Sequence, residues 1–245
     1  MRLTRAYVEL PLEAGDRVVL PDHVAAHLLR VLRLAPGDPC TLFNGDGRDY
    51  EALIVNANKR EMLAEVVLAK EVNNESPLRI TLLQGIARGE KMDLVVQKAT
   101  ELGVAAILPV TSERSEVRLD DQRAQKRHAH WRSVMISACE QSGRARTPHL
   151  AAPQSLQTAV TQLRTDPIKL TLDPNGEHSV ADLVFGASSA IVVAIGPEGG
   201  WSARDRAILH AVGFVGLRLG PRILRTETAG LAAIAALQSR FGDLN

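Results

Sequence analysis

The sequence has few of the features that mark secreted, metal-binding or membrane proteins. It contains only 2 cysteines, Cys40 and Cys139, which lie far apart and form no C-x-x-C pair. This scarcity argues against a zinc site and against a disulfide framework, and it is typical of a reducing compartment. The start, MRLTRAYVEL, lacks the apolar core of a signal peptide, and no apolar run reaches the roughly 18 residues that can span a membrane. We therefore expect a soluble cytoplasmic protein with no metal and no membrane partner.

The chain also lacks a strong net charge. Its 29 lysines and arginines and 28 aspartates and glutamates give a formal net charge of +1. Binding to a nucleic acid would therefore depend on local clusters of positive charge. The composition, 45% hydrophobic and 23% charged, is that of an ordinary globular protein, and 245 residues allow one large domain or two smaller ones.

Two Gly-Pro breaks near the end of the chain form the strongest pattern in the sequence. The apolar runs Ala190–Ile195 and Phe214–Leu219 stop at the Gly-Pro pairs 196–197 and 220–221, and a helical pattern follows each break. Short apolar runs that alternate with helices predict parallel strands in βαβ connections. In such sheets, ligands bind beyond the carboxyl ends of the strands, where these loops lie.

Neither loop matches the common nucleotide-binding motifs. The loop GPEGGWS has no lysine followed by Ser or Thr, as a P-loop requires, and no G-x-G-x-x-G spacing. One such loop alone could be a structural turn, but the two together carry more glycine and more charge than turns need. A third predicted strand, Ile168–Leu172, also ends in a turn-rich loop. We predict that the three loops form a crevice for a nucleoside-sized molecule that is held without a phosphate grip.

Residues 1–72 have the pattern of a small β-rich domain. Turn-prone residues separate four strand-like runs, Arg17–Leu20, Pro39–Phe43, Tyr50–Val55 and Met62–Leu68. A helix is predicted from His23 to Leu34, because its apolar residues recur at helical spacing. The polar, proline-containing stretch 73–77 marks the boundary with a second domain, 73–245. That domain begins as strand Leu78–Gly85, helix Met92–Leu102 and strand Val104–Val110, which favours an α/β fold.

Basic side chains gather in two places, the predicted helix of the first domain and residues 122–139. The second stretch contains no acidic residue. Both groups could be solvated helix faces or RNA contacts, and we favour RNA contact for the second. Trp131 lies in that stretch; it could stack on an unpaired base, but core packing is the favoured interpretation. Cys139 is interpreted as a buried thiol. The candidate RNA contacts are Arg2, Arg5, His27, Arg30, Arg33, Arg88, Lys91, Arg123, Lys126, Arg127, Arg144 and Arg146.

Two C-terminal segments, IGPEGG at 195–200 and LGPRILRTETA at 219–229, resemble the cofactor loops of the SPOUT class of RNA methyltransferases. Over essentially its full length the chain is similar to the bacterial small-subunit rRNA uridine-N3 methyltransferases. Further matches occur in the expected order at HLLRVLRL (27–34), RGEKMDLVVQKATELGV (88–104), ACEQSGRARTP (138–148) and ALQSRFGDL (236–244).

The resemblance implies a fold, a cofactor and partners. The fold would be an N-terminal PUA-like β-barrel joined to a C-terminal SPOUT α/β domain with a deep trefoil knot. The cofactor would be S-adenosylmethionine, bound in the knot at the interface of a homodimer. The substrate would be one uridine in the decoding region of 16S rRNA, recognised on the assembled 30S subunit. The implied cofactor-binding residues are Leu172, Ile195, Gly196, Pro197, Glu198, Gly199, Gly200, Leu219, Gly220, Ile223, Leu224 and Thr226.

Methylation at N3 of uracil requires that the N3 proton leave, because the protonated nitrogen has no lone pair to attack the methyl group. Arg222 or Arg225 could stabilise the uracil anion, and Glu227 or Glu198 could accept the proton. Structural roles also stay open, since Glu198 could pair with an arginine and Glu227 could cap the last helix. Arg225, Glu227 and Arg222 are the candidate catalytic residues. Two alternatives are a knotted methyltransferase for another base or a ribose oxygen, and a non-catalytic RNA-binding protein of ribosome assembly.

Overall fold

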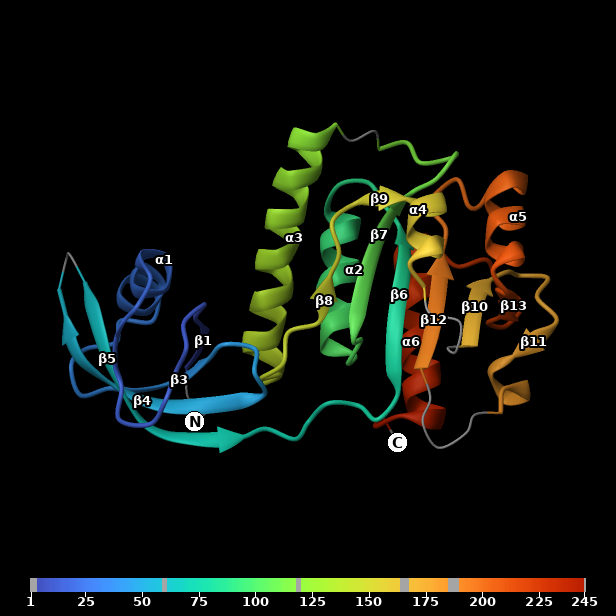
Figure 1. The fold of residues 1–245 in the computed structure, drawn as a ribbon. Helices are drawn as coiled ribbons and strands as arrows, with labels where there is room; N and C mark the ends of the chain where they lie inside the picture. The colour runs from blue at the N-terminus through green and yellow to red at the C-terminus, as the bar shows by residue number, and fades with distance from the viewer. Residues whose placement is uncertain (1–3, 59–60, 118–119, 164–167, 185–189, 245) are drawn as a thin grey trace. The chain divides into compact units, whose positions relative to one another are not determined.

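The computed structural model describes residues 4–58, 61–117, 120–163, 168–184 and 190–244 (Figure 1). The chain divides into two compact units. The N-terminal unit comprises Met1–Glu75 and Cys139–Thr147, and the C-terminal unit comprises Ser76–Ala138 and Pro148–Asn245. Residues 139–147 thus return to the first unit although the chain on either side of them belongs to the second. The sequence pattern did not indicate this return segment.

The sheet of the N-terminal unit has the strand order β1-β3-β4-β5-β2. Its strands are β1 (Arg5–Tyr7), β2 (Arg17–Val19), β3 (Pro39–Phe43), β4 (Arg48–Ala57) and β5 (Met62–Glu71). β1 pairs with β3 in parallel, and the other pairs are antiparallel. Alternate residues of β4 and β5, among them Tyr50, Ile54 and Ala64, point into the core, as the period of a strand requires. The sequence predicted β2 to β5 but missed β1.

The helix of the N-terminal unit is irregular. α1 (Asp22–Ala26) continues directly into a π-helical turn, His27–Val31. The sequence predicted one regular helix over 23–34, so this prediction was wrong for the last residues. Arg33 follows with a backbone φ of 57°, a left-handed conformation that residues other than glycine rarely adopt. π turns and such backbone outliers are frequent at functional sites.

Two ion pairs with buried arginines and partly exposed carboxylates join the return segment and β1 to the rest of the N-terminal unit. Arg144 pairs with Glu75, with Nε donating to a carboxylate oxygen at 2.9 Å, and Arg5 pairs with Asp49. Arg5 also donates to the carbonyl oxygen of Arg144 at 3.2 Å, so that the two pairs are linked. Both arginine side chains are less than one tenth exposed. These contacts give residues 139–147 a structural role in the first unit.

The C-terminal unit is built on a parallel sheet with the order β11-β13-β10-β12-β6-β7-β8, and β9 pairs with β7. Its strands are β6 (Arg79–Gly85), β7 (Ala106–Thr111), β8 (His149–Leu150), β9 (Gln154–Ser155), β10 (Ile168–Leu172), β11 (His178–Ser179), β12 (Ala190–Ile195) and β13 (Val215–Arg218). Its helices are α2 (Glu90–Glu101), α3 (Asp121–Ser142), α4 (Leu156–Thr161), α5 (Ala203–Ala211) and α6 (Thr226–Phe241), with a 3-10 turn at Val180–Asp182. The end of α3, from Cys139 on, belongs to the N-terminal unit. The α/β class predicted for this part of the chain is confirmed.

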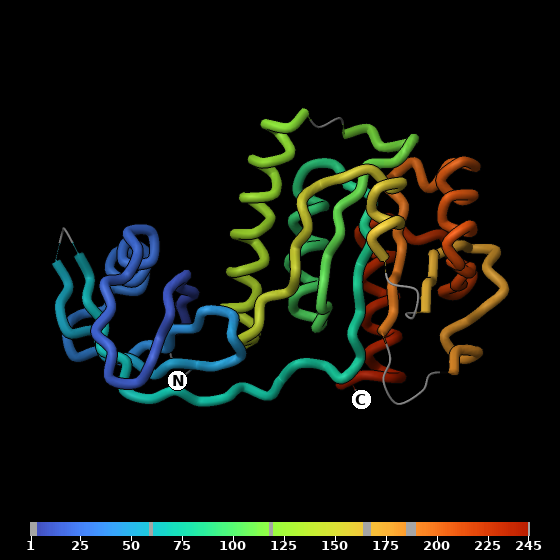
Figure 2. The backbone as a smooth tube through the Cα atoms, viewed as in Figure 1, coloured from blue at the N-terminus to red at the C-terminus, as the bar shows by residue number. Residues whose placement is uncertain are grey.

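Helices cover both faces of this sheet (Figures 1 and 2). Along β12, Val193 packs into the core beneath α2 and α6, whereas its neighbours Val192 and Ala194 pack into the core beneath α4 and α5. This alternation is the period of a strand that is buried on both sides, and it explains the continuous apolar run in the sequence. Trp131 of α3 is fully buried in the first of these cores, which confirms core packing over base stacking.

The register of the parallel strands brings their carboxyl ends to one edge of the sheet. β12 pairs with β6 up to Ile195 and Gln84, and β10 lies between β12 and β13. The loops after β10, β12 and β13 therefore meet at this edge, as the sequence predicted. Within the described part of the chain, no helix is long and apolar enough to cross a membrane.

Candidate functional site

A pocket of about 550 Å³ opens at the carboxyl edge of the parallel sheet. Three loops, those after β10, β12 and β13, supply most of its wall; α2 and α5 add one residue each, and the start of α6 adds three. The lining residues are Lys91, Leu172, Asp173, Pro174, Ile195, Gly196, Pro197, Glu198, Gly200, Trp201, Arg206, Leu217, Leu219, Gly220, Arg222, Ile223, Leu224, Arg225, Thr226, Glu227 and Ala229.

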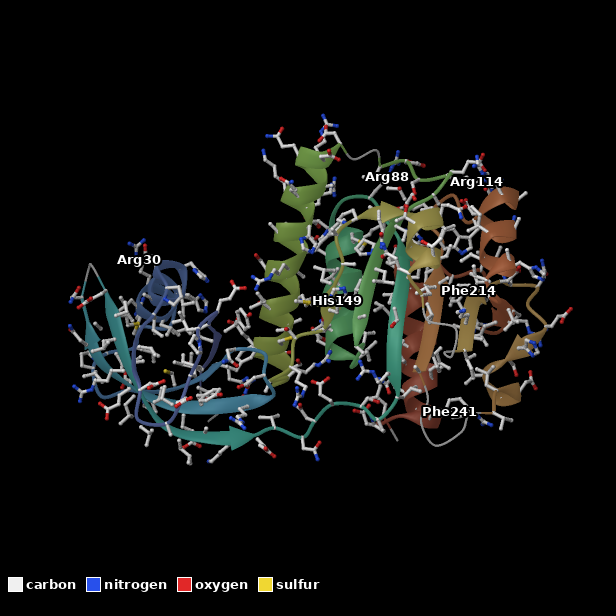
Figure 3. All side chains as sticks on the ribbon, in the orientation of Figure 1. Arg30, Arg88, Arg114, His149, Phe214 and Phe241 are labelled. Carbon is white, nitrogen blue, oxygen red and sulfur yellow. The ribbon has the colours of Figure 1, made fainter. Side chains whose placement is uncertain are left out.

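The structure gathers the predicted cofactor residues around this pocket. All of them except Gly199 line it, and so do the candidate catalytic residues Arg222, Arg225 and Glu227. Gly199 lies on the outer side of its loop, where its carbonyl oxygen accepts a hydrogen bond from Arg114 at 3.2 Å. Figure 3 shows Arg114 and Arg88 at the end of the sheet toward which β6 and β12 point.

Hydrogen bonds from side chains fix the two glycine-containing loops. Thr226, the first residue of α6, donates through Oγ1 to the carbonyl oxygen of Gly196 at 2.6 Å and so ties the second loop to the first. Trp201 donates through Nε1 to Thr171 Oγ1 of β10 at 3.1 Å. Gly200 closes the first loop with a φ of 64°, which a residue with a side chain rarely adopts. These contacts restrain both loops at the pocket wall.

Glu198 is engaged within the protein. One of its carboxylate oxygens accepts the backbone N–H of Arg88 at 3.0 Å and lies 3.4 Å from Lys91 Nζ. Partial burial acts to raise the pKa of Glu198, but the backbone amides of Arg88 and Glu198 itself and the ammonium of Lys91 outweigh it, so that the pKa is lowered. A carboxylate with a lowered pKa and existing partners is a weak proton acceptor.

Glu227 has a different environment. Its Oε2 is buried, lies 3.8 Å from Lys91 Nζ, and has no hydrogen-bond partner among the described residues. Lys91 was predicted as an RNA contact, but the structure places its ammonium at the pocket wall between these two carboxylates. The pocket therefore combines one occupied carboxylate with one that can still accept a hydrogen bond from a ligand.

The remaining predicted RNA contacts fall into three groups. Exposed side chains are those of His27, Arg30, Arg33, Arg88, Arg123, Lys126 and Arg146, and Arg127 is half-buried. Arg5 and Arg144 are buried in ion pairs, so they cannot present their guanidinium groups to a phosphate and are corrected to structural residues. Arg2 lies outside the described residues. The sequence alone could not show which arginines are exposed and which are buried, because the carboxylates that pair with the buried ones lie far away in the sequence.

One feature of the pocket was missed altogether. Gln84, at the end of β6, donates to Thr226 Oγ1 at 3.0 Å from beneath the loops. Nothing in the sequence marks it, because a single glutamine in an apolar strand fits no spacing motif. Elsewhere among the described residues, no cluster of three or more His, Cys, Asp or Glu side chains has the arrangement of a metal site.

Comparisons with known proteins agree with this fold and site. A family model described as an RNA methyltransferase domain matches residues 74–238, and one described as an RNA methyltransferase PUA domain matches residues 20–67. The fold and pocket thus define a PUA-containing RNA methyltransferase. More narrowly, the chain belongs to the family of ribosomal RNA small subunit methyltransferase E. The member from Buchnera aphidicola is 33% identical, with 100% of this chain and 99% of that protein covered.

Two solved structures are similar over their whole length. The ribosomal RNA small subunit methyltransferase E from Neisseria gonorrhoeae, bound to S-adenosyl methionine, is 43% identical with a TM-score of 0.94. A methyltransferase from Legionella pneumophila, also in complex with that cofactor, is 38% identical with a TM-score of 0.95. Each comparison covers 100% of both chains.

Proposed function

We propose that this protein transfers a methyl group from S-adenosylmethionine to N3 of one uridine in the decoding region of 16S rRNA, acting on the assembled 30S subunit. The observation that carries the proposal is the three-loop pocket, because its wall contains all but one of the residues that the family resemblance implies for the cofactor. The similar structures from N. gonorrhoeae and L. pneumophila hold that cofactor. As the family resemblance implies, we further propose a trefoil knot, a homodimer and a cytoplasmic location.

The pocket suits S-adenosylmethionine in size and chemistry. Its volume falls within the range of roughly 300–1,000 Å³ that is usual for ligands of this size. Leu172, Ile195 and Leu219 offer apolar walls for the adenine, and the glycines of the two loops let the backbone approach the ligand closely. The cofactor supplies the methyl group together with its own leaving group, so the protein has to position the base and manage its proton.

Glu227 is the proposed acceptor of the N3 proton. Its buried Oε2 has no hydrogen-bond partner among the described residues and can take one from the base. Glu198 is less suitable, because its pKa is lowered and one of its oxygens already accepts the backbone N–H of Arg88. The exposed guanidinium groups of Arg222 and Arg225 border the same pocket, where they can stabilise the negative charge on the uracil oxygens.

The RNA surface that we propose contains the exposed basic residues together with the half-buried Arg127. In the N-terminal unit these are His27, Arg30, Arg33 and Arg146, and in the C-terminal unit Arg88, Arg123, Lys126 and the half-buried Arg127. Contacts to phosphates would supply affinity without reading sequence, so the choice of uridine would rest with the pocket and with the structure of the assembled subunit.

The test is methyl transfer from labelled S-adenosylmethionine to 30S subunits that lack the modification, with free 16S rRNA in parallel and mass spectrometry of the nucleosides. We expect 3-methyluridine, formed on subunits in preference to free RNA. A different methylated nucleoside would replace the proposed target with another base or a ribose. No transfer together with no cofactor binding would leave a non-catalytic RNA-binding protein.

A further inference from the structure

Gln84 is a fully buried polar residue of the C-terminal unit. It is the penultimate residue of β6, a strand with neighbours on both sides, and its side chain is 0% exposed. A buried amide opposes folding unless hydrogen bonds compensate for the loss of water. An apolar residue would fill this site without the free-energy cost of burying a polar group. The contacts of the amide therefore indicate its role.

The amide of Gln84 starts a directional chain of hydrogen bonds. Its Nε2 donates to the carbonyl oxygen of Gly85 at 2.8 Å and to Thr226 Oγ1 at 3.0 Å, which uses both amide hydrogens. The Thr226 hydroxyl therefore accepts from Gln84, and its single hydrogen is directed to the carbonyl oxygen of Gly196 at 2.6 Å. One buried side chain thus joins the end of β6, the first turn of α6 and the loop after β12.

The other half of the amide gives no such benefit. Gln84 Oε1 is buried and has no hydrogen-bond partner among the described residues. An unpaired buried acceptor weakens the folded state. Stability alone therefore does not account for a glutamine at this position, whereas the orientation of Thr226 does.

We propose that Gln84 is a positioning residue for the cofactor pocket. Its amide fixes the hydroxyl of Thr226 and, through it, holds the Gly196 carbonyl and the first turn of α6 at the spacing that the ligand requires. Thr226 stands between Arg225 and Glu227, which both line the pocket, so the orientation of this turn also sets where those side chains lie. The inference rests on the proposed function only for the identity of the ligand.

The contact between Gly85 and the first loop supports this role. A Cβ at Gly85 would lie 2.8 Å from the carbonyl carbon of Gly196 and would overlap the backbone nitrogen of Pro197. The end of β6 therefore blocks movement of this loop in one direction. The Thr226–Gly196 bond, which Gln84 orients, restrains it from the side of α6.

The chain contains a matched control in Gln238, which is also 0% exposed. Its amide accepts from Ser76 Oγ at 2.6 Å and donates to the carbonyl oxygen of Leu102 at 3.1 Å. It lies in the last turns of α6, whereas Thr226 begins that helix, and it does not line the pocket. Both glutamines are buried and doubly hydrogen-bonded, but only one of them is linked to the pocket.

The experiment compares Gln84→Met with Gln238→Met, because methionine keeps the length of the side chain and removes the amide. Calorimetry measures affinity for S-adenosylhomocysteine, and thermal unfolding measures Tm. We expect Gln84→Met to weaken binding at least tenfold with a smaller loss of Tm than Gln238→Met, which should bind within about twofold of the wild type. Wild-type affinity in Gln84→Met, or affinity losses that simply follow Tm in both variants, would overturn the inference.

A double-mutant cycle tests the route through Thr226. Thr226→Val keeps the shape of the side chain and removes the hydroxyl. If Gln84 acts through that hydroxyl, the double variant should bind S-adenosylhomocysteine as tightly as whichever single variant has the lower affinity. Losses of affinity that multiply in the double variant would show that Gln84 does not act through Thr226.

If the wild type binds no S-adenosylhomocysteine, the proposed function fails, and hydrogen exchange still decides the role of Gln84. Gln84→Met should then speed the exchange of backbone amide hydrogens in residues 196–201 and 219–227. Unchanged exchange would overturn the inference that Gln84 is a positioning residue.

Discussion

At the scale of single residues, the two carboxylates of the pocket differ in the partners that the fold gives them. Glu198 is held by the backbone of Arg88 and by Lys91, whereas Glu227 Oε2 has only the more distant charge of Lys91. Lys91 also keeps two negative side chains together that would otherwise repel each other. This division supports the proposal that Glu227 rather than Glu198 acts on the substrate.

The first prediction concerns Glu227→Gln. Loss of the proton acceptor should reduce the rate of methyl transfer by about 100-fold or more, the scale of general base catalysis, while affinity for S-adenosylhomocysteine stays within a few fold. Single-turnover transfer to 30S subunits and calorimetry make the two measurements. Glu198→Gln is the control and should retain a larger share of the rate. A Glu227→Gln variant with the wild-type rate would remove this residue from the chemistry.

The second prediction follows from the lowered pKa of Glu198. Because the pKa is lower in the folded state, the ionised form stabilises the protein above the unfolded pKa, and this contribution disappears as the pH falls through the folded pKa. Glu198→Gln should therefore lower the free energy of unfolding at pH 7 by up to about 1 kcal/mol, and the difference should vanish in acid. Urea unfolding at several pH values measures it. A difference that is independent of pH would contradict the linkage.

At the scale of secondary-structure elements, strands and loops were predictable where local chemistry decides them. Ile168–Leu172 and Ala190–Ile195 were predicted at the bounds that the structure has, because an apolar run ending at a turn leaves little choice. The π turn at 27–31 was missed, since apolar periodicity describes only a regular helix. The hydrogen bond from Gln84 to Thr226 was missed because the two residues are 142 positions apart in the sequence.

The third prediction contrasts two glycines of the C-terminal unit. Gly85→Ala should cost about 1–3 kcal/mol and weaken cofactor binding, because the new methyl group would overlap the backbone at Pro197. Gly230→Ala in α6 meets only ordinary contacts of 3.4 Å and longer, so it should be neutral or stabilise by up to about 1 kcal/mol. Chemical unfolding and calorimetry compare them. Equal effects of the two substitutions would argue against a rigid contact between β6 and the loop.

The fourth prediction concerns the π turn of the N-terminal unit. Arg30→Ala should weaken binding to 30S subunits and reduce the slope of log affinity against log salt by about 1, with no change in Tm, because Arg30 is exposed. Arg17→Ala is a matched control, since Arg17 is an exposed arginine of the same unit that pairs with Glu65. Equal losses in both variants would mean that net charge, and not this turn, attracts the RNA.

At the scale of the whole molecule, the chain does not separate into two consecutive segments. The sequence predicted a first domain over 1–72, whereas the N-terminal unit extends to Glu75 and takes up residues 139–147. A composition shift can mark where a linker lies, but it cannot show that a later segment returns. One of the contacts that hold this segment, the pair of Arg144 with Glu75, joins residues 69 apart and becomes visible only in the folded chain.

The last prediction tests whether the return segment is part of the first folding unit. A fragment of residues 1–75 lacks Arg144, so Glu75 loses its ion-pair partner and Arg5 loses one hydrogen-bond acceptor, the carbonyl oxygen of Arg144. A unit of this size has little stability to spare. We therefore expect no cooperative thermal transition by circular dichroism for this fragment, and recovery of one when residues 139–147 are attached through a flexible linker. Arg144→Ala in the attached segment should abolish that recovery. If the fragment 1–75 unfolds cooperatively at the same temperature as the fusion, the return segment contributes nothing to folding, and the consecutive division read from the sequence is the better description of how the protein folds.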